Sequence, residues 1–88
     1  PIDTAASDIR NAAEQQRAEV LAIGPGHFGG VPDERLRTVL CRRSNGEFIT
    51  WRYDLDGPGF FSGRYFANVI EAVEDFRNLC HLEDSHGH

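Results

Sequence analysis

Alternating polar and apolar residues predict a β-hairpin in the middle of the chain, folded about Ser44-Asn45-Gly46-Glu47. Asn-Gly is the strongest short signal for a two-residue type I′ turn, in which both central residues have positive φ. Such a turn pairs Leu40 with Trp51 and Val39 with Arg52, and a slip of one residue would exchange the two faces. We therefore expect an apolar, buried face and an arginine face. The apolar face comprises Leu36, Leu40, Trp51 and Tyr53, and the arginine face comprises Arg35, Arg37, Arg43 and Arg52.

The end of the chain carries the clearest helical pattern. Asn68 is a favourable N-cap and Glu71 stands three residues later, as in a capping box. Apolar residues then recur at helical spacing and predict one continuous buried face. That face comprises Val69, Ala72, Val73, Phe76, Leu79 and Cys80, with Glu71, Glu74 and Asp75 pointing outward.

The start of the chain is ambiguous. Ile9, Ala13 and Val20 follow a helical spacing, so residues 4–22 are expected to form a helix that ends at Gly24-Pro25. The run at 18–23 is also typical of a short strand, and this alternative stays open. Residues 24–34, rich in glycine and proline, are predicted to be a loop.

The expected fold class is α+β. A short strand at 60–66 follows the hairpin, so the predicted order is α-β-β-β-α, a three-stranded antiparallel sheet with both helices packed on one face. Eighty-eight residues correspond to one domain, assigned here to residues 1–81, with 82–88 as a flexible C-terminal tail.

Charge is distributed unevenly over the sequence. The net charge is −5, yet six of the nine basic residues, all arginines, lie within residues 35–64, and both flanks are acidic. An acidic protein is a poor general binder of nucleic acid. No apolar run approaches the length of a membrane span, no targeting segment is visible, and two cysteines do not make a disulfide framework. We expect a cytoplasmic protein that does not bind membranes.

Two glycine-rich segments, 24–30 and 57–63, agree at five of seven positions. They suggest a ligand loop at Gly26, His27 and Gly59, and a small enzyme would use the loop histidine His27. Ordinary turn chemistry explains the same glycines. The spacing of Cys80, His81, His86 and His88 matches no zinc motif, so neither a metal nor another cofactor is expected.

A nucleic-acid interface is the principal alternative function. Arg35, Arg37, Arg43 and Arg52, interleaved with aromatic side chains, resemble in type the residues that hold single strands, since arginines meet phosphates while aromatic rings stack on bases. Acidic residues predicted on the same face, Asp54 among them, oppose this interpretation.

The leading hypothesis is a small intracellular, non-enzymatic interaction or regulatory module, acting on a protein partner or on itself as a homodimer. A thin core, spare aromatic residues and the lack of a convergent catalytic set motivate it. The residues predicted to bind the partner are Phe60, Phe61, Arg52, Arg64 and Phe28.

Overall fold

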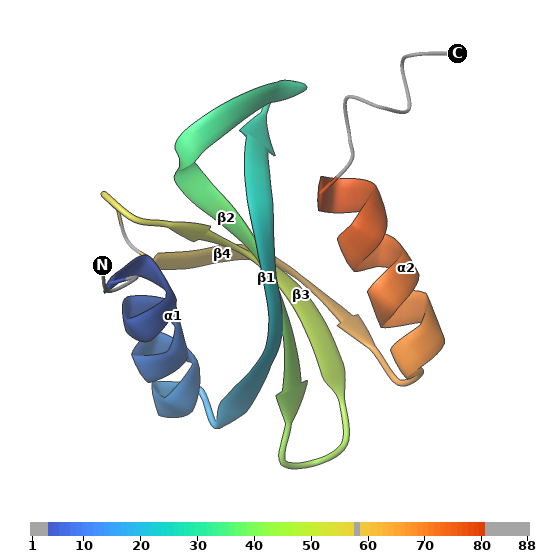
Figure 1. Ribbon diagram of the computed structural model, residues 1–88. Helices are drawn as coiled ribbons and strands as arrows, with labels where there is room; N and C mark the ends of the chain where they lie inside the picture. Colours follow the sequence, from blue (N-terminus) through green and yellow to red (C-terminus); the bar gives the residue numbers. More distant parts are fainter. Residues whose placement is uncertain (1–3, 58, 81–88) are drawn as a thin grey trace.

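The protein has an α+β fold, as predicted, with a four-stranded antiparallel sheet between two helices (Figure 1). The computed structural model describes residues 4–57 and 59–80. The strands lie in the order β1-β2-β3-β4, so each neighbours the next along the chain. The elements are α1 (Thr4–Gln15), β1 (Ala18–Phe28), β2 (Val31–Arg43), β3 (Phe48–Asp54), β4 (Gly59–Phe66) and α2 (Val69–Cys80). The tail predicted at 82–88 lies outside the described residues.

The strand that was not predicted is β1, which forms where the sequence predicted helix and loop. The first helix ends at Gln15, and residues 18–23 begin β1, so the strand alternative is correct and the prediction of helix over 4–22 is wrong. The predicted loop 24–34 is also mostly strand. Gly29 and Gly30, with φ of 62° and 80°, form the turn that joins β1 to β2. Pairing with β2 along the length of β1 outweighs the weak helical preference of this segment.

The central hairpin forms as predicted, but its register differs by one residue. Leu40 lies opposite Thr50, and Val39 lies opposite Trp51. Arg43 N–H donates to Glu47 O at 2.7 Å, and Gly46 N–H donates to Arg43 O at 2.9 Å. Among the central loop residues only Gly46 has a positive φ, 90°. The loop is therefore a three-residue type I turn with a G1 bulge, and its extra residue shifts every cross-strand pair.

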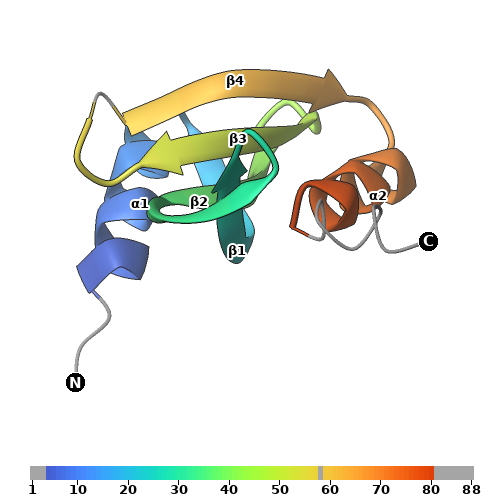
Figure 2. The same cartoon turned by 90° about the horizontal axis from the view of Figure 1, so that it is seen from above.

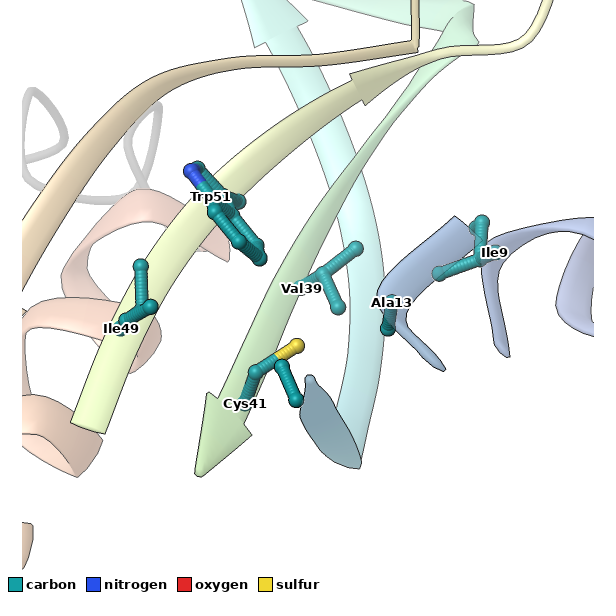
Figure 3. Packing of buried hydrophobic residues seen from close by; sticks show 7 residues of the cluster. Ile9, Ala13, Val39, Cys41, Ile49 and Trp51 are labelled. Carbon is teal, nitrogen blue, oxygen red and sulfur yellow. The ribbon is translucent and has the colours of Figure 1, made fainter. Parts of the chain in front are cut away.

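Because of this shift, the residues of the predicted apolar face are divided between the two sides of the sheet. Val39 and Trp51 point toward α1, where they pack with Ile9 and Ala13 (Figure 3). Leu36 and Leu40 alternate with these residues and point to the opposite face, which α2 covers. The seven buried residues of the α1-side cluster are Ile9, Ala13, Ala18, Val39, Cys41, Ile49 and Trp51.

The two helices lie on opposite faces of the sheet, so the expectation of both on one face is wrong (Figures 1 and 2). Contacts confirm the separation: Ile9 of α1 belongs to the Val39 cluster, whereas Asp75 of α2 accepts a hydrogen bond from Thr50 on the other face. With a helix on each face, the middle of β2, from Thr38 to Cys41, and of β3, from Ile49 to Trp51, is buried. Across the described residues, no helix is long and apolar enough to cross a membrane.

Candidate interaction surfaces

Among the described helices and strands, α2 carries the most exposed aliphatic side chains, and they lie together on its outer face. Val69, Ile70 and Val73 are 42%, 73% and 36% exposed. They line a shallow hollow of about 550 Å³, together with Glu74, Arg77 and Asn78. We call these six residues the α2 outer patch.

The rotation of α2 about its axis differs from the sequence-based prediction. Its buried residues are Ala72 and Cys80, whereas Val69 and Val73, predicted to be buried, are exposed. A signal was present in the sequence: with Ile70 included, the apolar positions of this helix cover too wide an arc to pack on one sheet.

Asp75 sets this rotation. Its carboxylate accepts hydrogen bonds from Thr50 Oγ1 and from Arg64 Nη1, each at 2.6 Å, so it faces the sheet although the sequence placed it outward. At the other end of the helix, Cys80 packs directly on Gly24 of β1, where a side chain would collide with its sulfur. Two fixed points on one side of α2 leave the outer patch facing away from the sheet.

A second exposed apolar group lies at the tip of the β1–β2 hairpin. The last paired residue of β2 toward β3 is Leu36, yet β2 continues to pair with β1 as far as Phe28 and Val31. Phe28 and Val31 are 70% and 62% exposed. This two-stranded arm extends beyond β3 and presents Phe28, one of the predicted partner-binding residues, at its end.

The other predicted partner-binding residues do not form a surface with Phe28. Phe60 stacks on Trp51 at 4.3 Å between ring centroids and meets Tyr53 edge-on at 4.9 Å, so it completes the α1-side core. Arg64 forms an ion pair with Asp75. Arg52 and Phe61 are cross-strand partners, and both are partly buried.

The arginines proposed for nucleic acid do not share one face. In the observed register Arg37 lies opposite Tyr53 and Arg52 lies opposite Thr38, which places their side chains on opposite sides of the sheet. Arg37 Nη1 donates to the carbonyl oxygens of Glu34 and Leu36.

Two further arginines of that set already have partners. Arg35 donates to both carboxylate oxygens of Asp33, and these bonds hold the pKa of Asp33 below its usual value. The Arg43 guanidinium lies over the Tyr65 ring at 5.8 Å. Each of these guanidinium groups therefore already contacts a group of its own chain.

The two glycine-rich segments are not neighbours in the sheet. Gly26 and His27 belong to β1, and Gly59 opens β4, while β2 and β3 lie between these edge strands. His27 is a buried strand residue opposite Pro32 rather than a loop residue. Within residues 4–57 and 59–80, no group of three histidine, cysteine or acidic side chains is placed to hold a metal; His81, His86 and His88 lie outside these ranges.

The cysteines are buried thiols. Both Cys41 and Cys80 are free, and burial raises the pKa of Cys41 to about 12. Burial also raises the pKa of Cys80, an effect opposed by a hydrogen bond with Thr38. Neither thiol has the depressed pKa of a nucleophile.

Comparison with known proteins yields no match: no family model, no curated protein and no solved structure is significantly similar to this chain.

Proposed function

We propose that the protein is a small non-enzymatic interaction module that associates with a second copy of itself through the α2 outer patch. The observation that carries this proposal is the exposure of Val69, Ile70 and Val73 side by side on a helix whose other face is already seated on the sheet. Aliphatic side chains grouped in this way are typical of a surface that is covered in the working state.

The charges of the patch favour a second copy as the occupant. The patch carries one acid, Glu74, and one base, Arg77. The patch therefore carries no net charge, so two copies meet without like-charge repulsion. Neutrality matters in a twofold interface, because the same patch lies on both sides of the axis. Three aliphatic side chains fall well short of the ~800 Å² per partner of a standard interface, so we expect a weak, concentration-dependent dimer.

Sedimentation equilibrium from about 1 µM to about 1 mM tests the proposal. The wild-type protein is expected to pass from monomer to dimer in this range, and Ile70→Glu is expected to remain monomeric. Val31→Glu is the matched control, because Val31 is also an exposed aliphatic residue but lies at the hairpin tip. It should dimerise like the wild type.

Charge reversal provides an independent readout. Glu74→Arg gives the patch two positive charges and Arg77→Glu gives it two negative charges, in both copies at once, so each should weaken the dimer, whereas the double reversal should restore it. A protein that is monomeric at every concentration would contradict the proposal. So would a dimer that Val31→Glu dissociates and Ile70→Glu does not, since that result assigns self-association to the hairpin tip.

A further inference from the structure

We infer that the groove along β1 is a second binding site, which takes a short extended peptide carrying a carboxylate side chain. This groove encloses about 670 Å³, within the usual range for binding sites. Its walls come from three elements, and its floor includes every residue of β1 from Val20 to Gly26. It is separate from the α2 outer patch and shares no residue with it.

The continuous run of β1 residues identifies what the groove offers. Successive side chains of a strand point to opposite faces, so a hollow on one face is lined mainly by every second residue. A hollow that takes in all seven residues from Val20 to Gly26 reaches the backbone itself. β1 is an edge strand that pairs with β2 alone, so its other side presents N–H and C=O groups to an incoming strand.

The usable part of this edge is short. The β1–β2 register is irregular between Val20 and Ala22 and again between Pro25 and His27. Pro25 also has no N–H to donate. The regular stretch at 22–24 therefore accommodates a short segment and discourages the open-ended pairing that leads to aggregation.

The polar residues of the groove indicate the charge of the ligand. Arg10 of α1 lines the groove on one wall, and Arg37 of β2 lines it on another. Arg10 makes no hydrogen bond or ion pair with any described residue, and Arg37 donates to described residues only through Nη1, to main-chain carbonyls. The acids of the lining are Asp33, which Arg35 already neutralises, and Glu34. One cation remains in excess, which favours a ligand with one carboxylate, and the exposed edges of Val20 and Ile23 favour an apolar neighbour beside it.

Selection from a library of random octapeptides displayed on phage, followed by titration of a selected peptide against ¹⁵N-labelled protein, tests the inference. We expect enriched sequences to combine an acidic residue with β-branched residues. The amide signals whose chemical shifts change on binding should belong to residues 20–26 of β1. Methylating the peptide's backbone nitrogens should abolish binding, because it removes the donors needed for strand pairing while it leaves the side chains unchanged.

The charge requirement is tested on both partners. Arg10→Gln should weaken binding about tenfold, and replacing the peptide carboxylate with an amide should have a similar effect. The two changes together should weaken binding little more than either change alone, because they remove the same contact. Arg17→Gln, at an exposed arginine between α1 and β1 that lines neither site, is the matched control and should bind like the wild type.

Three results would overturn the inference: no enrichment over background, shifts that map outside the groove, or binding that tolerates backbone methylation. If the β1 amides become more protected from hydrogen exchange as the protein concentration rises without peptide, the edge pairs with a second copy of the chain. That result would also overturn the inference. Because the two sites share no residues, Ile70→Glu should leave peptide binding intact, so failure here is distinguishable from failure of the α2 dimer.

Discussion

Removing the Asp75 carboxylate should loosen α2 from the sheet by a predictable amount. Asp75 bonds Thr50, whose side chain is completely buried, and Arg64, whose side chain is 64% exposed. Asp75→Ala leaves the Thr50 hydroxyl without its acceptor in a buried position, which costs about 1–3 kcal/mol of the free energy of unfolding. Loss of the exposed Arg64 ion pair adds only about 0–1 kcal/mol.

A double-mutant cycle isolates the buried bond. Thr50→Val keeps the side-chain shape but removes the donor, and should cost about 1.5–3 kcal/mol because the acceptor is charged. Combined with Asp75→Ala, the second change should cost much less than it does alone, with a coupling energy of about 1–2 kcal/mol. Arg64→Gln is the control and should cost less than about 1 kcal/mol.

Urea titration followed by Trp51 fluorescence provides the assay, because Trp51 is the only tryptophan and is buried. A slope of about 1 kcal/mol per molar urea, at the low end for small proteins, converts these energies into midpoint shifts of about 1–3 M. If Asp75→Ala shifts the midpoint by less than about 0.5 M, or if the cycle shows no coupling, the assignment of Asp75 as the residue that orients α2 is wrong.

Other elements of the fold give further predictions. Ile9→Ala should destabilise the protein by about 2–5 kcal/mol in the same titration, since Ile9 is a fully buried anchor of α1; a loss below about 1 kcal/mol would contradict its place in the core. Gly24→Val should be strongly destabilising because its side chain collides with Cys80, and Cys80→Ala in the same chain should recover part of the loss; no recovery would refute the contact. Burial raises the pKa of Cys41 to about 12. The free energy of unfolding is therefore unaffected by this thiol below its ordinary pKa of 9.0, and it falls as pH rises from 9.0 toward 12, because only the unfolded chain ionises readily there. Urea midpoints measured across this range should decline less in Cys41→Ala than in the wild type, and equal declines would count against a protonated native thiol.

Local signals in the sequence were sufficient for the elements that depend on few distant contacts. The helix α2 has the predicted cap, since Ile70 N–H bonds Asn68 Oδ1 at 2.7 Å, and it spans Val69–Cys80. The reversal of the chain at Asn45-Gly46 and the burial of Trp51 were also predicted correctly. Capping and turn formation involve residues only two to four positions apart, so the sequence alone determines them.

The tertiary structure decided which side chains lie on which face of the sheet. Asn-Gly suits both a two-residue and a three-residue loop, and the difference of one residue moves Val39 and Trp51 to one side and Leu40 to the other. The three-residue loop lets Ile9 and Ala13 of α1 bury the Val39 side, while α2 covers the Thr50 side.

The candidate sites depend on the same long-range choices. The α2 outer patch exists because Asp75 bonds Thr50, twenty-five residues away in the sequence, and so turns Val69 and Val73 outward. The groove along β1 exists because residues 18–28 pair with β2 instead of continuing α1. Segments with weak local preference take the conformation that their distant partners stabilise, and no local pattern in the sequence records that partnership.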